Sequence, residues 1–447
     1  MKKIRIWRIV MEIARKRIEE LVDYGSFVEI GESITARFTD FCSPSDAKDG
    51  DGIITGYGTM GGKLVYIYSQ KNTSMGGSLG EMHGRKIVNL YNLAMKSKAP
   101  IIGILDCSGI RVEEGLDGLN ALSKVYKAQA KAVGVIPQIV IVAGTCGGGV
   151  SILANMADFI FVDEESGKLF VNSQNFLNGE ELFTQKTYTD AILKSEELTA
   201  YVKKLVEILP SSAEELPMVK ECKDDLNREL SDNCTNDTRT LLTEMADNHR
   251  FLEIKAQWGD DMVAGLMRLN GAVVGVYGND GKSERMTAEG IEKALRLVTL
   301  CDRFNIPVLT ITDTKGYDVT IETEKNFSKS ASGLIMALAQ ADVPKVNLIT
   351  GDIYGSAYSL MNSKGLSCDL AFMWDTATVN IIDPMDAVTI MYPGISPAEA
   401  EKKAEEYSRI HCSPAALAKH GYVDKVISPK DTRKYIIGAF EAFSNVF

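Results

Sequence analysis

The sequence predicts an α/β protein made of two copies of one fold. The first observation is that hydrophobic, β-branched segments alternate with amphipathic helical patterns, as in sheets covered by helices on both faces. The second is self-similarity, because residues of the same type recur 207 positions apart, as Pro100 and Pro307 do. The third is the length of 447 residues, which suits two domains of ordinary size.

The repeat is clearest in two pairs of segments. Residues 99–109 (APIIGILDCSG) correspond to residues 306–316 (IPVLTITDTKG), and residues 135–151 correspond to residues 342–358 in the same register. Single matches of glycine or proline are expected by chance, because turns use these residues repeatedly. Seven identical pairs in one ungapped register indicate a duplication instead: Lys86/Lys293, Pro100/Pro307, Asp106/Asp313, Gly109/Gly316, Pro137/Pro344, Gly144/Gly351 and Gly148/Gly355.

Each copy is expected to contain the same elements in the same order. A β-hairpin (53–70 and 265–279) is followed by a helix (80–98 and 288–305), a buried strand, a loop, a second helix and a second buried strand, after which a glycine-containing stretch opens a short helix. A polar run at residues 224–238 indicates a connector. The predicted domains are therefore residues 1–215 and 241–447, joined by residues 216–240.

The composition excludes several classes of protein. The 60 acidic residues outnumber the 49 basic ones, and no basic stripe occurs, so nucleic acid is not an expected partner. Four histidines and eight scattered cysteines show no metal-ligand or disulfide spacing, so no metal is expected. Basic residues run through the start of the chain, and Pro137 and Asp158 interrupt its most apolar stretch. We therefore expect neither an export signal nor membrane insertion, and predict a cytoplasmic protein.

The glycine stretch AGTCGGGVSILANMAD (143–158) is the first candidate site. The first turn of a helix carries backbone N–H groups without intrahelical partners, and glycine lets another molecule approach them closely. Such a helix start suits a negative charge that develops on an oxygen. A phosphate site fits less well, because Cys146 replaces the second glycine of a dinucleotide motif and Val150 replaces the lysine of a P-loop. A tight turn that serves packing alone is the structural alternative.

The duplication favours a function over packing alone. The second copy carries the same device at residues 354–357 (YGSA). In each copy a further loop follows the preceding strand, at residues 107–111 (CSGIR) and 314–317 (TKGY). Because the carboxyl ends of neighbouring parallel strands meet at one edge of a sheet, the two loops of a copy are expected to bring two N–H donors to one oxygen.

These motifs resemble the carboxyltransferase subunits of biotin-dependent acyl-CoA carboxylases, of the propionyl-CoA carboxylase β and transcarboxylase type. The resemblance covers nearly the whole chain and includes ARKRIEELVDYGSFVE, GDGIITGYGTMGGKLVYIYSQ, GVIPQIVIVAGTCGGG, LCDRFNIPVLTITDTKGY and HGYVDKVISPKDTRKYI. It implies two duplicated crotonase-like β-β-α spiral domains, in agreement with the repeat. It also implies transfer of a carboxyl group from carboxybiotin to the α-carbon of a short acyl-CoA.

The resemblance assigns site residues to each domain. In the N-terminal domain the amides of Gly148 and Gly149, helped by the loop around Gly109, are expected to hold the thioester oxygen. In the C-terminal domain the amides of Ser356 and Ala357 are expected to hold the ureido oxygen of biotin. The other residues expected on the acyl-CoA side are Ser108, Gly109, Ile110, Arg111, Tyr358 and Ser359, and those on the biotin side are Gly316 and Gly355.

The resemblance also implies partners. Biotin is expected on a separate carrier protein that a biotin carboxylase subunit loads, and a coenzyme A thioester is the second substrate. In the family the two substrates meet between the N-terminal domain of one subunit and the C-terminal domain of another. A homo-oligomer is therefore expected, namely a hexamer built as a trimer of dimers.

Several residues depart from the family pattern on the ligand side of the fold. Ile110 replaces a small residue, residues 315–317 replace Pro-Gly-Phe, and Ser356 replaces glycine, although a right-handed backbone conformation would keep its amide in place. Three alternatives therefore stay open: a biotin-dependent decarboxylase subunit, a catalytically silent structural subunit, and a crotonase-type hydratase or isomerase with Glu113 and Glu114 as acid and base. The acyl group and the direction of transfer stay undetermined.

Three residues near the loops also have structural alternatives. Arg111 is either near CoA or a surface arginine paired with a neighbouring glutamate. Cys107 and Cys146 have no histidine near them in the sequence, so we expect buried thiols rather than nucleophiles.

Overall fold

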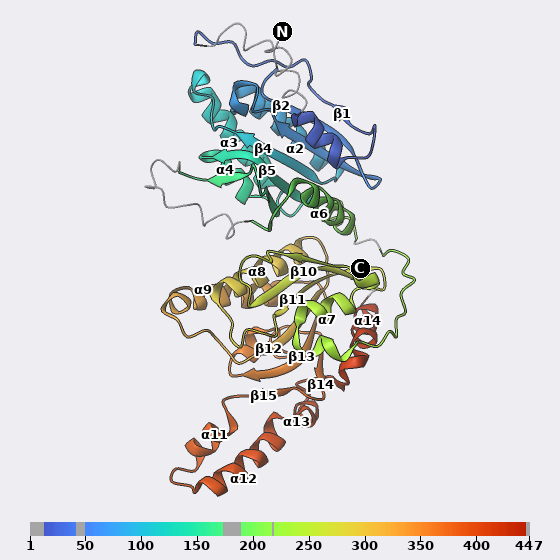
Figure 1. The fold of residues 1–447 in the computed structure, drawn as a ribbon, viewed down its shortest axis with the longest axis vertical. Coiled ribbons are helices and arrows are strands. Elements are labelled where there is room, and N and C mark those ends of the chain that lie inside the picture. Colours follow the sequence, from blue (N-terminus) through green and yellow to red (C-terminus); the bar gives the residue numbers. More distant parts are fainter. Residues whose placement is uncertain (1–12, 42–49, 173–188, 217–218, 444–447) are drawn as a thin grey trace. The chain divides into compact units, whose positions relative to one another are not determined.

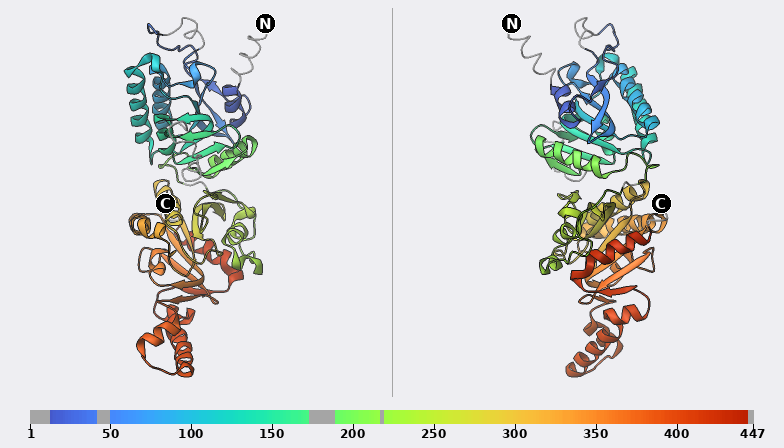
Figure 2. Two further views of the ribbon diagram at one scale, coloured as in Figure 1. Left: turned by 60° about the vertical axis from the view of Figure 1, so that its left-hand side comes forward. Right: turned by 90° about the vertical axis from the view of Figure 1, so that its right-hand side faces the viewer.

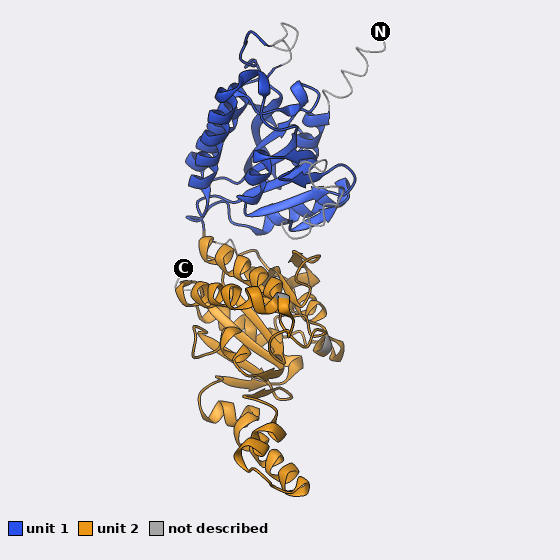
Figure 3. Ribbon diagram, turned by 90° about the vertical axis from the view of Figure 1, so that its left-hand side faces the viewer, with its two compact units in different colours: residues 1–215 blue, residues 216–447 orange. Residues whose placement is uncertain are grey.

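The chain forms two compact units with one sheet in each (Figure 3). The computed structural model describes residues 13–41, 50–172, 189–216 and 219–443. The units comprise residues 1–215 and 216–447.

The first unit holds an eight-stranded sheet in the order β1-β2-β3-β4-β5-β6-β8, with β7 paired to the end of β5. Its strands are β1 (Val28–Glu29), β2 (Ile53–Met60), β3 (Lys63–Gln70), β4 (Ile101–Cys107), β5 (Gln138–Gly147), β6 (Phe159–Asp163), β7 (Lys168–Phe170) and β8 (Ala191–Leu193). The first three strands pair antiparallel, and all later pairs are parallel. The central parallel strands are buried, as expected of a sheet with both faces covered.

Helices cover both faces of this sheet (Figure 1). α2 (Glu81–Ser97) and α3 (Leu116–Ala132) share a core with alternate residues of the central strands, such as Leu105 and Val140. On the other face, Ile104 lies with Leu198 of α6 (Ser195–Ile208) and with the helical residues 13–21. The short α4 (Gly149–Asn155) follows the carboxyl end of β5.

The second unit repeats this sheet in the order β16-β14-β13-β12-β11-β10-β9, with β15 paired to the end of β13. Its strands are β9 (Phe251–Ile254), β10 (Met262–Leu269), β11 (Ala272–Asn279), β12 (Val308–Thr314), β13 (Lys345–Tyr354), β14 (Leu370–Trp374), β15 (Thr378–Asn380) and β16 (Lys425–Ile427). Its helices are α7 (Thr238–Met245), α8 (Ala288–Arg303), α9 (Ile321–Gln340), α10 (Ala357–Leu360), α11 (Pro384–Met391), α12 (Pro397–Tyr407), α13 (Pro414–Lys419) and α14 (Thr432–Ala442). Within this unit, α11 and α12 extend away from the sheet as a helical pair (Figures 1 and 2).

The predicted duplication is confirmed down to single hydrogen bonds. The bounds of β12 and β13 lie 207 positions after those of β4 and β5. The ammonium group of Lys86 donates to the carbonyl of Ile53 at 2.8 Å, and that of Lys293 donates to the carbonyl of Met262 at 2.7 Å. These matched lysines explain one pair of the sequence repeat, because each ties the helix that follows the β-hairpin, α2 or α8, to the first strand of that hairpin.

The paired glycines inside β5 and β13 are explained by close approach. A Cβ at Gly144 would lie 2.1 Å from a carboxylate oxygen of Asp106, and one at Gly351 would lie 2.2 Å from Asp313. The aspartate of each unit thus occupies the space that a side chain would need. The repeated Asp and Gly are one structural device.

The described part of the predicted connector is folded into the second unit. Residues 217 and 218 lie outside the described residues, but the N–H of Lys220 donates to Gly271 at 3.1 Å and that of Leu230 donates to Lys430 at 3.1 Å. Leu230 and Cys234 are buried. The polar composition of this stretch suggested a linker because composition does not reveal long-range backbone hydrogen bonds.

The described residues contain neither a helix suited to crossing a membrane nor a cluster suited to holding a metal ion. None of their helices combines the length and apolar character that crossing a membrane requires. Among the same residues no group of three or more histidine, cysteine or acidic side chains is arranged to hold a metal ion.

Candidate active site

Two loops of the first unit meet at the carboxyl end of the sheet. One follows β4 and contains residues 108–111, and the other is the glycine stretch 147–149 between β5 and α4. Cys107 at the end of β4 is the strand partner of Cys146 in β5. The two loops therefore start side by side, as the sequence predicts.

The three consecutive glycines meet different steric requirements. A Cβ at Gly147 would lie 2.5 Å from the ring of Phe170, and one at Gly149 would lie 2.9 Å from Leu122 of α3. Gly148 has φ 61° and ψ −139°, a conformation that residues with a side chain rarely adopt. No atom outside its chain neighbours lies within 4 Å of the position of its Cβ. Packing thus explains two of the glycines, whereas Gly148 borders open space.

The backbone N–H groups at this point lack acceptors. Within the described ranges, the amides of Ile110, Gly148 and Gly149 have no hydrogen-bond acceptor. The carbonyl of Gly149 accepts a hydrogen bond from the Tyr126 hydroxyl at 2.6 Å, which fixes the first peptide of α4. Preorganised N–H groups without a protein acceptor are what an oxyanion site requires.

The second unit builds the same two loops. Gly316 repeats the φ of Gly109, at 116° against 117°. Gly355 repeats the φ of Gly148, at 63° against 61°. The predicted right-handed conformation of Ser356 is confirmed, with φ −68° and ψ −7°.

The N–H groups of this second helix start divide into two kinds. That of Gly355 donates to the carbonyl of Asn380 in β15 at 2.8 Å, so it is occupied. Those of Ser356 and Ala357 have no acceptor in the part of the chain that the structure describes. The two residues predicted for the biotin side therefore carry available donors.

The repeat adds one candidate donor that the sequence analysis missed. In the 207-residue register Ser356 corresponds to Gly149 and Ala357 corresponds to Val150. The predicted pair Gly148 and Gly149 is thus one position out of step with its counterpart. The repeat register itself was the signal that points to Val150.

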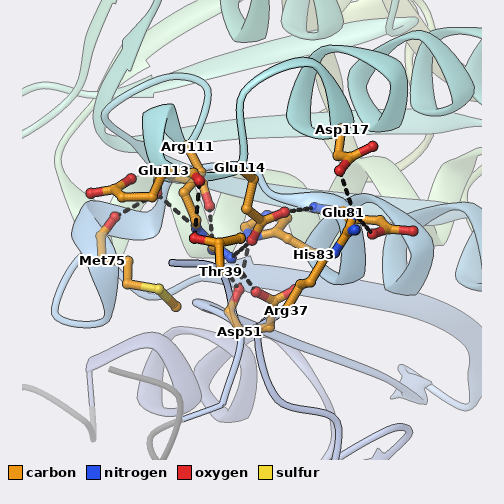
Figure 4. Close-up of polar contacts among 11 residues, drawn as sticks. Arg37, Thr39, Asp51, Met75, Glu81, His83, Arg111, Glu113, Glu114 and Asp117 are labelled. Atoms are coloured by element: carbon orange, nitrogen blue, oxygen red, sulfur yellow. Dashed lines mark hydrogen bonds and ion pairs between the residues drawn. The ribbon is translucent and has the colours of Figure 1, made fainter. Parts of the chain in front are cut away.

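Arg111 lies beneath the first loop rather than on the surface (Figure 4). Its side chain is 1% exposed and contacts Asp51 at 2.5 Å and Glu114 at 2.7 Å. It also donates to the carbonyl of Ser78 at 2.7 Å. The expected pair with a neighbouring glutamate is confirmed by Glu114, but the pair is buried rather than on the surface. The expected role near CoA stays a prediction. Arg111 holds loop 108–111 to the elements below.

Burial dominates the titration of this cluster. It raises the pKa of Asp51 to about 6, against the pull of Arg111. Burial, together with Arg111, lowers the pKa of His83 to about 3. The neutral His83 ring contacts the carbonyl of Asp51 at 3.0 Å and the amide of Gln70 at 3.3 Å. This histidine therefore has a structural role, in line with its lack of metal-ligand spacing.

Glu114 is not available as a general acid or base. Its carboxylate is fully buried, accepts the N–H of Glu81 at the start of α2 at 2.5 Å, and pairs with Arg111. Glu113 is exposed, and its backbone carbonyl accepts a hydrogen bond from Thr39. Because one of the two carboxylates belongs to the scaffold, the geometry argues against the hydratase alternative.

Ile110 is directed into the unit. It is partly buried against the core, and a Cβ at Gly118 of α3 would lie 2.9 Å from its Cγ2. The N–H of Leu79 donates to the carbonyl of Gly109 at 2.9 Å, and the N–H of Arg111 donates to the carbonyl of Leu79 at 3.0 Å. These two hydrogen bonds fix the backbone on both sides of Ile110. A glycine on α3 thus accommodates the isoleucine that the family pattern lacks.

The remaining predicted residues fall into two groups. Ser108 is exposed and its N–H donates to Gly76 at 3.0 Å, beside the first helix start. The half-buried Tyr358 and the exposed Ser359 lie on α10 in the second unit. The residues predicted for the acyl-CoA side are thus divided between the two units.

The two cysteines at the loop starts are confirmed as buried thiols. Both side chains are inaccessible to solvent. Burial raises the pKa of Cys107 to about 11 and raises that of Cys146 further. Since the thiolate is the nucleophilic form, neither is a nucleophile at neutral pH.

Comparison with known proteins identifies the family. Residues 11–445 match the family described as "Carboxyl transferase domain". The chain belongs to this family. A propionyl-CoA carboxylase beta chain from Roseobacter denitrificans is 34% identical over 461 residues, which cover 97% of this chain and 90% of the relative. A methylmalonyl-CoA decarboxylase subunit alpha from Veillonella parvula is 31% identical over 453 residues, which cover 95% and 89%.

A solved structure agrees with this assignment. The crystal structure of transcarboxylase 12S, described as a hexamer with hydrolysed methylmalonyl-coenzyme A bound, has a TM-score of 0.90 at 27% identity and covers 97% of this chain and 90% of its own. The predicted family, the duplicated α/β fold and the class of biotin-dependent acyl-CoA carboxyltransferase are confirmed. The relatives include both a carboxylase and a decarboxylase, so the direction of transfer stays open.

Proposed function

We propose that this carboxyltransferase moves a carboxyl group between carboxybiotin on a separate carrier protein and the α-carbon of a short acyl-CoA. The observation that carries the proposal is the duplicated helix start, where two amides of each unit lack acceptors within the described residues, namely those of Gly148 and Gly149 and those of Ser356 and Ala357. A second loop lies beside each helix start. Two such sites suit a reaction in which two oxygens gain negative charge.

In the first unit the acceptor is the thioester oxygen. The α-proton of a thioester is weakly acidic, so its removal requires stabilisation of the charge that moves onto this oxygen. The amides of Gly148 and Gly149 donate to it, and the loop that contains Ser108, Gly109 and Ile110 lines the same site. Each N–H donor of an oxyanion hole contributes about 3 kcal/mol to lowering the barrier.

In the second unit the residues fit the ureido oxygen of biotin. The amides of Ser356 and Ala357 would hold this oxygen, and Gly316 and Gly355 shape the loops around it. When bound, carboxybiotin would supply the carboxyl group, and the biotin left after its loss would take up the α-proton. The protein itself then has to bind, orient and stabilise, and neither loop pair needs a side-chain base.

The proposal includes an assembly. The transcarboxylase 12S relative is a hexamer, and we extend this state to the present chain. Because the acyl-CoA loops and the biotin-side loops lie in different units, a shared site forms where units of two subunits meet. The biotin carrier and the biotin carboxylase are separate partners in this scheme.

The test is carboxyl transfer by the purified full-length chain. Free carboxybiotin is offered with acetyl-, propionyl- and butyryl-CoA, and the carboxylated thioesters are offered with free biotin. Transfer in either direction supports the proposal, and the direction with the higher kcat/KM separates a carboxylase from a decarboxylase. A folded chain that transfers nothing would be a silent structural subunit. Turnover of an enoyl-CoA without biotin would favour the hydratase.

A further inference from the structure

A pair of hydroxyl groups lies at the helix start of the second unit. The side-chain oxygens of Tyr317 and Ser356 are 2.7 Å apart and join the loop after β12 to the loop after β13. Ser356 is exposed, whereas the ring of Tyr317 is half-buried and lies 4.4 Å from the ring of Phe327 in α9, centroid to centroid. The tyrosine is thus held in place, and the serine is open to a ligand.

The fold does not need this hydroxyl pair. In the duplicate unit Ile110 stands at the position of Tyr317 and Gly149 at that of Ser356, so no hydroxyl is present there. The loops after β4 and β12 nevertheless agree in backbone, because Gly109 and Gly316 have φ 117° and 116°, and both loops pair with the segment before α2 or α8, through Leu79 and Met286. This loop therefore keeps its conformation without the hydroxyl pair, whereas the helix start differs, since it begins at Gly149 in the first unit and at Ala357 in the second.

The chemistry of two hydrogen-bonded hydroxyl groups suggests which function the pair serves. Each hydroxyl has one proton to donate. The phenol is the more acidic group, so it is the better donor, and Ser356 then accepts from Tyr317. This leaves the proton of Ser356 for a third group. A donor that itself accepts a hydrogen bond is polarised and donates more strongly, and most strongly to a charged oxygen.

We propose that the hydroxyl of Ser356 is a third donor to the oxygen that the amides of Ser356 and Ala357 hold, and that Tyr317 positions its proton. The inference rests on the function proposed above. Three covalent bonds separate the serine oxygen from the amide nitrogen of the same residue, so an oxygen bound at that amide lies within reach of the hydroxyl. Two hydrogen bonds anchor the Tyr317 loop. The N–H of Asp318 donates to the carbonyl of Met286 at 2.8 Å, and the guanidinium of Arg285 donates to the carbonyl of Tyr317 at 3.1 Å.

Three single variants and one double variant test the proposal in the transfer assay. Ser356→Ala keeps the amide and the backbone but removes the hydroxyl, and we expect kcat/KM for the biotin substrate to fall about tenfold. This is less than the 10²–10³ of a buried oxyanion donor, because Ser356 is exposed. Tyr317→Phe keeps the ring against Phe327 and should lower kcat/KM for the biotin substrate about threefold to tenfold. Ser356→Thr keeps a hydroxyl and should restore most of the rate.

The double variant shows whether Tyr317 acts through Ser356. If it does, Ser356→Ala combined with Tyr317→Phe is no slower than Ser356→Ala alone, whereas independent effects would multiply. The KM for acyl-CoA and the midpoint of thermal unfolding should stay unchanged in all variants. The matched control is Ser332→Ala on α9, an exposed serine whose hydroxyl donates to the carbonyl of Lys329, which should behave as wild type.

The outcomes separate this inference from the proposed function. A wild-type chain without transfer activity overturns both. An active wild type with Ser356→Ala and Tyr317→Phe unchanged overturns the hydroxyl pair alone. Loss of rate together with a lower unfolding midpoint and a raised KM for acyl-CoA would show a merely structural contact, and this also overturns it.

Discussion

Replacing Gly148 by alanine tests whether the first helix start is part of the site. The glycine has φ 61° and ψ −139°, and holding a residue with a side chain in such a conformation costs about 1–3 kcal/mol. No atom outside the chain neighbours lies within 4 Å of the new methyl group, so no clash adds to this cost. The backbone is expected to relax instead and to move the amides of Gly148 and Gly149. A displacement of about 1 Å at a catalytic group lowers the rate on the order of 100-fold.

The expected result is therefore a large loss of kcat with a modest loss of stability. Gly61→Ala is the matched control, because Gly61 has φ 58° and also has no atom within 4 Å of its Cβ position, but lies in the turn between β2 and β3. Both variants should unfold at lower urea concentration, and only Gly148→Ala should lose carboxyl transfer. A Gly148→Ala chain that is destabilised like the control and transfers at the wild-type rate would refute the role of this helix start.

Three further variants probe the scaffold of the first unit. Arg111→Met leaves the Asp51 carboxylate buried without its cation, so the free energy of unfolding in urea should fall by about 3–5 kcal/mol. The control Arg85→Met replaces an exposed arginine and should change this free energy by less than about 0.5 kcal/mol. Equal effects of the two variants would contradict the buried pair. Because the pKa of Asp51 is raised from 3.8 to about 6, folding favours its protonated form, and this stabilisation is complete below pH 4 and lost as the pH rises through 6. Between pH 4 and pH 7 the free energy of unfolding of Asp51→Asn should therefore rise by about 3 kcal/mol relative to that of the wild type. A difference between the two proteins that does not vary with pH would disprove the raised pKa. Tyr126→Phe removes the donor to the carbonyl of Gly149 and should lower kcat about threefold to tenfold at unchanged KM; wild-type kinetics would show that other contacts fix this peptide.

Much of the site was predictable because its backbone follows from local signals. Glycines at fixed offsets from buried strands predicted two helix starts, and their positions at the carboxyl ends of β5 and β13 followed from the alternation of strands and helices. The hydroxyl pair of Tyr317 and Ser356 had a weaker signal. Both residues depart from the family pattern, but only the fold shows that the two departures meet.

The sequence by itself determined the fold class, the duplication and the family, because periodicity and a constant 207-residue register are properties of the chain read in order. The tertiary structure alone decided where side chains point. It turned Arg111 inward to Asp51, made Glu114 the acceptor for the start of α2, and folded residues 219–240 into the second unit. The physical reason is that burial and hydrogen bonding depend on which distant segments share a volume, and strand pairing across the sheet sets this rather than any local pattern.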